Sequence, residues 1–241
     1  MLANNNEAII NKLAKNSVKT NKKQYAILFF TIILSAFMLF CVFTIGMTYL
    51  NSSRLQNTRL NGAEYDIVTM NGFTSEQLNT LQQNENIRSV GIESYAGFIQ
   101  STEYDKTVEI GLLWCDEVFW DNLMSPARTK LDGHYPQNKN ELMVTKDILK
   151  TCGNENLSVG DSLILTYENN TGVYTDEFVI SGIWDGYGDT SAGFVSKAFY
   201  DETGYDLKNN GILCIKLNCN YVFPTTIQSI EKSLNLSLIH I

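Results

Sequence analysis

A long run without charged residues dominates the hydrophobic pattern near the start of the chain. Residues 24–53 contain no Asp, Glu, Lys or Arg, and residues 26–40 at their centre are mostly Ala, Ile, Leu, Met and Phe. A bilayer core of about 30 Å needs roughly 20 helical residues at 1.5 Å each. A charge at mid-membrane costs about 2.5–3.5 kcal/mol on insertion scales. The pattern therefore predicts a transmembrane helix over residues 24–50.

The charges around this run predict its orientation. Five lysines precede it against one acid, Glu7, whereas 13 of the 18 basic and 25 of the 26 acidic residues follow it. Lys-rich short segments stay in the cytoplasm, so we expect residues 1–23 to be cytoplasmic and the acidic remainder to be extracytoplasmic, in a bacterial cell membrane. A cleaved signal peptide is the alternative. Its apolar core is usually about 7–15 residues with a small-residue cleavage site after it, and residues 46–50 lack such a site.

The segment before the run has helical periodicity of its own. Ile9, Ile10 and Leu13 recur at three- and four-residue spacing within residues 4–20, and the lysines fall between them. This spacing predicts an amphipathic helix that lies at the membrane interface. The alternative is a lysine-rich tail that only sets the orientation.

After the run, short apolar segments alternate with Asn, Asp, Gly and Thr. The polar residues 51–62 are expected to extend the spanning helix up to Asn61-Gly62. Irregularly mixed strands and helices predict an α+β domain over residues 51–235. Thr74 and Gln77 have capping-box spacing, and Gly153 fits the left-handed position that ends a helix. We expect strands at 65–70, 87–92, 95–101, 107–114, 141–144, 162–167, 177–183, 193–195 and 211–217, helices at 74–81, 117–124, 146–152, 197–203 and 225–234, and a turn at 131–136.

Composition excludes several classes of function. The acidic balance leaves no basic face to neutralise phosphates, so nucleic acid is not an expected partner. His134 and His240 are the only histidines, which argues against zinc or triad chemistry. No phosphate-binding Gly-x-x-x-x-Gly-Lys loop is present. We therefore predict no catalytic, cofactor-binding or metal-binding residue in this chain.

The five cysteines leave a question open. Cys41 lies within the predicted span and is expected to pack there. An extracytoplasmic location permits disulfides, and the other four cysteines allow three pairings. Buried free thiols are the interpretation we favour. These four residues are Cys115, Cys152, Cys214 and Cys219.

The remaining candidates are structural. Asp185-Gly186-Tyr187-Gly188-Asp189 alternates oxygen ligands with glycines as a calcium loop does, but the rest of an EF-hand does not follow and a plain loop is favoured. Glu141 and Asp161 are expected to be cap and turn residues rather than catalytic carboxylates. The expected core comprises Trp114, Phe119, Trp120, Leu163, Leu165, Phe178, Ile180, Ile183, Phe194, Ile212 and Ile215.

An ordered series of motifs gives the chain its likeness to a known family. Gly133-His134-Tyr135-Pro136 precedes Asn140-Glu141 and a short strand, the Gly160-Asp161 turn follows, and Val179-Ile180-Ser181-Gly182 comes last. With the Lys-rich lead and the span, this order resembles the MacB/FtsX-like permease subunits of ABC transporters. The resemblance implies a MacB-like extracytoplasmic core domain.

The resemblance also implies a function and partners. A permease of this kind pairs with an ATP-binding subunit that hydrolyses ATP, so this chain is not expected to be an enzyme. Membrane lipid and a homo- or heterodimer of permeases are further implied partners. The implied substrates are peptides, antibiotics or lipid-linked molecules, which are exported or extracted as the extracytoplasmic domain moves.

Two features leave alternatives open. Such permeases continue through at least three more spans, and residues 236–241 resemble a translated sequencing adaptor, so we expect a fragment with a non-native tail. A membrane-anchored sensor domain of a signalling receptor shares the lead, the span and an α+β domain. A surface enzyme tethered by its N-terminus is a third class, disfavoured because a nucleophile motif is missing.

Overall fold

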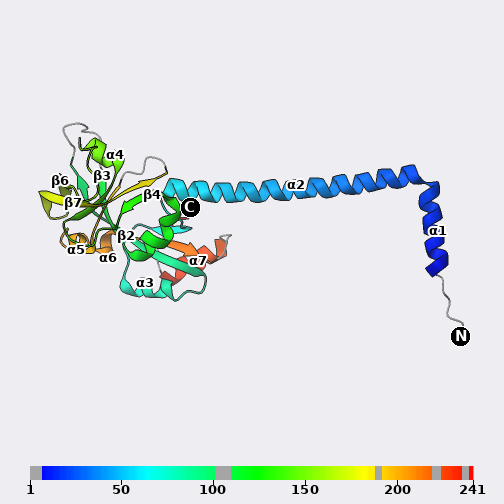
Figure 1. Ribbon diagram of the computed structural model, residues 1–241. Helices are drawn as coiled ribbons and strands as arrows, with labels where there is room; N and C mark the ends of the chain where they lie inside the picture. Colours follow the sequence, from blue (N-terminus) through cyan, green and yellow to red (C-terminus); the bar gives the residue numbers. More distant parts are fainter. Residues whose placement is uncertain (1–6, 101–109, 188–191, 219–223, 235–238, 241) are drawn as a thin grey trace. The chain divides into compact units, whose positions relative to one another are not determined.

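The computed structural model describes residues 7–100, 110–187, 192–218, 224–234 and 239–240. The chain divides into two compact units, residues 1–55 and residues 56–241. The first unit contains α1 (Glu7–Thr20) and most of α2 (Lys22–Asn61), and the end of α2 belongs to the second unit (Figure 1). The predicted amphipathic helix is confirmed over its described residues, and the expected extension of the spanning helix to Asn61 is also confirmed.

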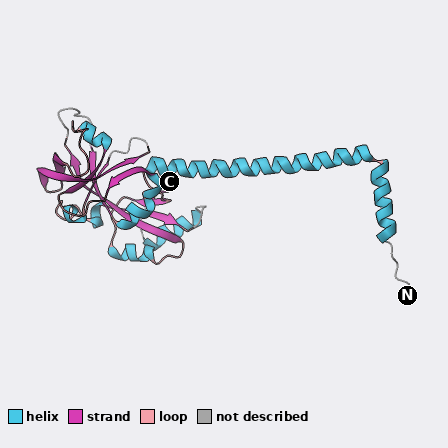
Figure 2. Cartoon of the chain, in the orientation of Figure 1, coloured by secondary structure: helices cyan, strands magenta, loops and turns pink. Residues whose placement is uncertain are grey.

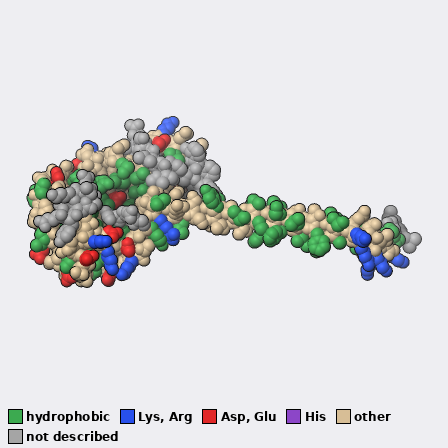
Figure 3. Space-filling view, turned by 90° about the horizontal axis from the view of Figure 1, so that it is seen from above, with side chains coloured by type: hydrophobic (Ala, Val, Ile, Leu, Met, Phe, Trp, Pro, Cys, Tyr) green, Lys and Arg blue, Asp and Glu red, His purple; other side chains and the backbone are tan. Residues whose placement is uncertain are grey.

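Helix α2 has the length and composition of a membrane span. Within the described part of the chain, it is the one helix that is long and apolar enough to cross a bilayer by these criteria. Its 40 residues extend roughly 60 Å at 1.5 Å each, about twice the thickness of the hydrocarbon core. Figure 3 shows hydrophobic side chains along the helix and Lys side chains near its start.

Three hydroxyl groups inside the apolar part of α2 form hydrogen bonds within the helix. Thr31, Ser35 and Thr44 each donate a hydrogen bond of 2.8 Å to the carbonyl oxygen four residues earlier. In hydrocarbon an unpaired polar group costs several kcal/mol. These side chains are therefore compatible with a lipid environment.

The second unit is built on one mixed sheet, drawn in magenta in Figure 2. In its described residues the strand order is β10-β1-β9-β2-β3-β8-β5-β7-β4, and β6 pairs with both β2 and β7. Pairing is antiparallel except between β3 and β8 and between β5 and β7. The strands are β1 (Ile67–Thr69), β2 (Ile87–Ile99), β3 (Ile110–Cys115), β4 (Arg128–Gly133), β5 (Glu141–Thr145), β6 (Ser162–Asn169), β7 (Gly172–Gly186), β8 (Ala192–Val195), β9 (Gly211–Leu217) and β10 (Ile239–His240).

Six of these strands form a closed ring. The pairings run from β2 through β3, β8, β5, β7 and β6, and return to β2 where Phe98 and Ile99 meet Glu168 and Tyr167. Strand β2 reaches this closure because a bulge between Tyr95 and Gly97 shifts its register. Gly97 is needed there, since a Cβ atom would lie 2.7 Å from the Glu168 carbonyl oxygen.

Short helices connect the strands, and their caps follow the sequence. Thr74 and Gln77 form the predicted capping box at α3 (Ser75–Gln82), where each side chain bonds the backbone N–H of the other residue. Gly153, with φ of 72°, follows α4 (Lys146–Thr151) as predicted. The other helices are α5 (Lys197–Tyr200), α6 (Leu207–Asn210) and α7 (Pro224–Leu234).

The buried side chains form two clusters. The first contains Phe178, Ile180, Leu163 and Leu165, and Ile183 is only partly buried against it. The second lies under the helical turns η1 (Val118–Leu123) and η2 (Ser125–Ala127) and contains Phe119, Trp120, Phe194 and Ile212. Ten of the eleven expected core residues are buried; the expectation was wrong in degree for Ile183.

Two predicted strands are one. Residues 87–92 and 95–101 were expected to be separate, but β2 runs unbroken from Ile87 to Ile99. Glu93 and Ser94, which separate the two predicted strands, pair in register with β3 and β9, and the bulge comes after them, between Tyr95 and Gly97.

The turn predicted at 131–136 is wrong for its first half. Strand β4 continues to Gly133 and pairs with β7 at the edge of the sheet. All its residues after Arg128 are exposed, so no alternation of apolar and polar residues marks it in the sequence. Pairing of its backbone with β7 sets its conformation.

The remaining differences concern helices and the chain end. One α-helix was predicted over residues 117–124, but residues 118–123 form the π-helix η1, and a 3₁₀ turn that contains Pro126 follows. Helix α6, which is capped by Asp206, was not predicted. The backbone of β10 pairs with β1, although residues 236–241 were expected to be a non-native tail. Pairing in the structure does not test the origin of this segment.

Candidate functional site

The strongest candidate site is the place where α2 enters the sheet domain. The last turns of α2 belong to the same compact unit as the sheet. Thr58 is buried, and the Arg59 guanidinium carbon lies 4.0 Å from the centre of the Tyr187 ring. Ala63, just past the helix, is 1 % exposed within the second cluster. The end of the helix is therefore packed into the domain.

A buried lysine fixes the next three residues. The Lys216 ammonium on β9 lies 3.1 Å from a Glu64 carboxylate oxygen and 3.3 Å from Asp66 Oδ1. Only 8 % of the Lys216 side chain is exposed. A buried charge needs a partner because leaving it unpaired costs several kcal/mol. Lys216 therefore holds the segment that follows α2 on the sheet.

Backbone hydrogen bonds reinforce this attachment. The Glu64 N–H donates to the Leu123 carbonyl oxygen of η1 at 2.6 Å, and the Asp66 N–H donates to the Ile215 carbonyl at 2.9 Å. The Asp66 carboxylate also accepts a hydrogen bond of 2.9 Å from the Leu217 N–H. The segment is thus joined to η1 and to β9 together, and we call residues 58–66 with Lys216 the junction.

An open hollow of about 370 Å³ lies beside the junction. Arg88 and Lys216 contribute positive charge to its lining, and Glu64 and Asp121 contribute negative charge. These charges balance, so the hollow selects neither anions nor cations. We assign it no ligand.

The motif residues behind the family resemblance have structural roles. Gly133 has a φ of 90°, and a Cβ atom there would lie 2.2 Å from the Ser181 carbonyl oxygen. A Cβ atom on Gly182 would lie 2.7 Å from Met143 Cε and 2.9 Å from the His134 carbonyl oxygen. Both glycines therefore permit the close approach of β4, β5 and β7.

The two motif carboxylates bind backbone N–H groups of turns. Glu141 accepts hydrogen bonds of 2.7 Å from the Gln137 N–H and 3.1 Å from the Asn138 N–H. Burial favours a higher pKa for Glu141, but these hydrogen bonds outweigh it and lower the pKa. Asp161 accepts a hydrogen bond of 2.8 Å from the Ser158 N–H. These contacts confirm the predicted cap and turn roles.

The other sequence candidates are dispersed. Asp185 and Gly186 extend β7 rather than forming a loop, and Gly188 and Asp189 lie outside the described residues. His134 is exposed, and the described part of the chain contains no group of three His, Cys, Asp or Glu residues that could hold a metal ion. His240 lies in β10, far along the chain.

The described cysteines are free thiols. Cys115 and Cys214 are buried in the second cluster, Cys152 is partly buried, and Cys41 lies in α2. Burial raises the pKa of the Cys115, Cys152 and Cys214 thiols, which keeps them protonated. Cys219 lies outside the described residues.

One acidic residue within β2 is electrostatically unusual. Glu93 pairs across the sheet with Cys115 and Ile212, both buried in the second cluster. Side chains opposite each other on neighbouring strands share a face, so the Glu93 carboxyl lies on the apolar side of β2. Burial raises the pKa of Glu93 to about 7. Burial also raises the pKa of Tyr65.

Sequence reasoning missed Glu64, Asp66, Lys216 and Glu93. A signal for Lys216 was present, because it interrupts the otherwise apolar strand Ile212–Leu217 and a lysine there requires a carboxylate partner. Glu93 similarly lies within a strand of small and apolar residues. The sequence does not say which carboxylates meet Lys216, since Asp66 is 150 residues away.

Comparisons with known proteins found similar solved structures only. The periplasmic region of MacB from Actinobacillus actinomycetemcomitans matches with a TM-score of 0.48 and 11% identity over 75% of this chain and 91% of that one. The extracellular domain of the noncanonic ABC-type transporter YknZ from Gram-positive bacteria matches with a TM-score of 0.45 and 11% identity over 73% and 98%. No protein-family model and no curated protein matches the chain.

A third similar structure is a domain of a protein described as a permease from Porphyromonas gingivalis. Its TM-score is 0.43 at 12% identity, over 73% of this chain and 87% of that one. The function of the present chain therefore has to be inferred from its own residues.

We expect Asp66→Ala to destabilise the domain by about 2–4 kcal/mol, because it leaves buried Lys216 with Glu64 alone and the Leu217 N–H without its acceptor. Urea unfolding of the purified chain in detergent, followed by tryptophan fluorescence, measures the change. Glu202→Ala is the matched control, since its pair with Lys139 is exposed and should contribute about 0–1 kcal/mol. Equal losses in the two variants would contradict the role of the junction.

The raised pKa of Glu93 predicts a pH dependence of stability. Burial raises the pKa of folded Glu93 to about 7, above the ordinary value of 4.5 that applies to the unfolded chain. Its contribution is thus complete below pH 4.5 and is lost as the pH rises through 7. The Glu93→Gln side chain cannot ionise. The Tm of this variant relative to the wild type should therefore rise as the pH is raised from 5 to 8.

A change of about 1 kcal/mol shifts the Tm of a domain of this size by about 2–4 °C, and we expect a gain of at least that size. Thermal unfolding at both pH values, with exposed Glu177→Gln as the control, provides the measurement. A gain that does not change with pH would rule out titration of Glu93.

Proposed function

We propose that this chain is the first span and the extracytoplasmic domain of a permease subunit of a MacB/FtsX-like ABC transporter. The observation that carries the proposal is the continuity of α2. One helix contains the apolar span and also the turns that are packed into the sheet domain. The ordered Gly133, Glu141, Gly160 and Gly182 motifs, which maintain the packing of β4 to β7, support the family assignment.

The proposed mechanism is mechanical coupling. An ATP-binding subunit in the cytoplasm binds and hydrolyses ATP, and the membrane helices respond by shifting between two arrangements. A continuous helix resists bending because its backbone groups are hydrogen-bonded along its length. Helix α2 and the junction would thus transmit the shift to the extracytoplasmic domain. Peptides, antibiotics or lipid-linked molecules are the proposed substrates, and a second permease and membrane lipid are proposed partners.

Four carboxylates, two in the motifs and two in the junction, support a non-enzymatic role. Glu141 and Asp161 bind turn backbone, and Glu64 and Asp66 pair with Lys216. These oxygen atoms are engaged in holding the fold together. We accordingly assign ATP hydrolysis to the partner subunit.

A membrane-anchored sensor domain is the second candidate. One observation favours it: the domain has a small hollow lined by tyrosines and carboxylates, as a ligand-binding input domain would. The two candidates differ in the coding sequence downstream. Further apolar spans identify a permease, and a single further span followed by a cytoplasmic signalling domain identifies a sensor.

The proposed orientation predicts a protease-accessibility pattern. An epitope tag in the exposed hairpin between Asn169 and Gly172 should be removed by proteinase K added to cells whose cell membrane is intact. Any outer layer that keeps the protease from the cell membrane is made permeable first. A tag placed before Glu7 should be protected until the cell membrane is permeabilised. Protection of the hairpin tag in intact cells would reverse the orientation.

The transport assignment predicts where the ATPase activity lies. The purified full-length gene product should hydrolyse no ATP alone, and adding the ATP-binding subunit encoded beside it should give activity in lipid vesicles. The Asp66→Ala variant should keep this ATPase but lose at least half of the substrate transport coupled to it, because the junction transmits movement. ATPase activity of the isolated permease would refute the assignment.

A further inference from the structure

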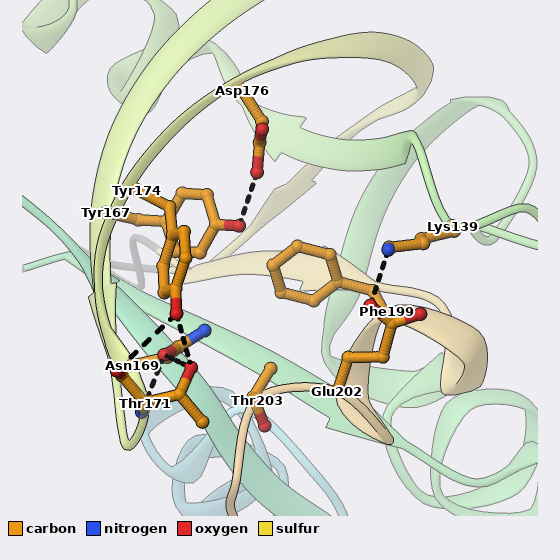
Figure 4. Close-up of a pocket in the computed structure, with 9 residues that line it drawn as sticks. All are labelled: Lys139, Tyr167, Asn169, Thr171, Tyr174, Asp176, Phe199, Glu202 and Thr203. Carbon is orange, nitrogen blue, oxygen red and sulfur yellow. Dashed lines mark hydrogen bonds and ion pairs between the residues drawn. The ribbon is translucent and has the colours of Figure 1, made fainter.

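A hollow beside the β6–β7 hairpin is lined by aromatic rings. It has a volume of about 200 Å³ and lies between the β6–β7 hairpin and the segment around α5. The Tyr167 and Tyr174 rings stack at 6.0 Å between centroids, and the Phe199 ring lies 5.4 Å from Tyr167. Figure 4 shows these three rings around the hollow.

The hollow also carries a carboxylate that is free to meet a cation. Asp176 Oδ2 accepts a hydrogen bond of 2.6 Å from the Tyr167 hydroxyl. Asp176 belongs to none of the ion pairs among the described residues. Glu202 across the hollow is already neutralised by Lys139 (Figure 4). The lining thus has a net negative charge that is concentrated at Asp176.

The combination of rings and a carboxylate selects an organic cation. Aromatic rings attract ammonium and guanidinium groups through their quadrupole, and a carboxylate adds a charge-assisted hydrogen bond. An anion would be repelled by the Asp176 carboxylate. A purely apolar ligand would leave the Asp176 charge in a less polar environment.

The volume limits the size of the ligand. Sites for drug-sized molecules usually measure about 300–1,000 Å³, and this hollow is smaller. It accommodates one group of the size of a single basic side chain. The formal net charge of −8 on the chain favours the approach of such a cation.

We propose that this hollow binds an alkylammonium or guanidinium group, with Asp176 as the charged partner and Tyr167, Tyr174 and Phe199 as the aromatic walls. The group comes from a basic side chain of a polypeptide or from a free amine. The inference does not depend on the transport assignment, because a sensor domain would use the same site.

The test uses the full chain in detergent micelles and three probes. The first is a fluorescein-labelled heptapeptide of alternating lysine and glycine, and the second is the same peptide with glutamine in place of lysine. Butylammonium chloride is the third probe, added as a competitor. Fluorescence polarisation measures the Kd at low salt.

Two variants address the site and a third controls for surface charge. Asp176→Asn removes the charge but retains an acceptor for the Tyr167 hydroxyl, and Tyr174→Leu removes an exposed ring. Each should weaken binding of the lysine peptide at least about 3-fold, as expected from cation–π and ion-pair energies at exposed sites. Glu177→Gln removes the same charge from the neighbouring exposed residue of β7, outside the hollow, and should change the Kd less than about 2-fold.

The outcomes separate the two sources of the cation. Displacement of the lysine peptide by butylammonium shows that the ammonium group alone suffices, so free amines are ligands. Saturable peptide binding that butylammonium does not displace assigns the site to polypeptides. Equal binding of the glutamine peptide, an equal effect of Glu177→Gln, or no saturable binding of any probe would overturn the proposal.

Discussion

Strand β2 imposes the main constraint on the domain, because its backbone is shared among three partners. Residues 87–94 pair with β9, residues 93–99 pair with β3, and Phe98 and Ile99 also pair with β6. Buried N–H and C=O groups must be paired. Strand β2 therefore has to keep its register with β9, β3 and β6 at the same time. The bend at Gly97 brings β2 within reach of β6, which closes the ring.

This strand also links the two regions that we associate with function. The junction is held on β9, and β9 pairs with residues Ile87–Ser94 of β2. The aromatic hollow lies by β6, and β6 pairs with the other end of β2. The strand is thus a direct structural path between the segment that follows α2 and the hairpin. Coupling between the junction and the hollow would require two arrangements of β2 with different energies.

Local chemistry made much of the fold predictable from the sequence. The absence of charge over residues 24–53 defines α2, and Thr74 with Gln77 defines the start of α3, because these signals involve residues close together in the chain. Gly153 marks the end of α4 for the same reason. Strand β4 escaped prediction because its exposed residues have no periodic pattern, and pairing with β7 alone makes it a strand.

The candidate sites were far less predictable. Lys216 pairs with Asp66, which is 150 positions away in the chain. The Tyr167 ring on β6 likewise contacts the Phe199 ring on α5. Pairings of this kind depend on the order of strands in the sheet, which hydrophobic periodicity does not specify. The sequence shows that a lysine in strand Ile212–Leu217 needs a partner, and only the fold identifies which carboxylates supply it.

The buried thiols impose an order of events on biogenesis. Cys115 and Cys214 are enclosed in the second cluster, and Cys115 Sγ lies 3.6 Å from the Tyr135 hydroxyl. Disulfide exchange requires an accessible thiolate, so the folded domain protects both sulfur atoms. In the proposed extracytoplasmic location, a newly exported chain would lack this protection in an oxidising compartment. With that location, η1 would have to pack against the sheet before the Cys115 and Cys214 thiols are oxidised to disulfides.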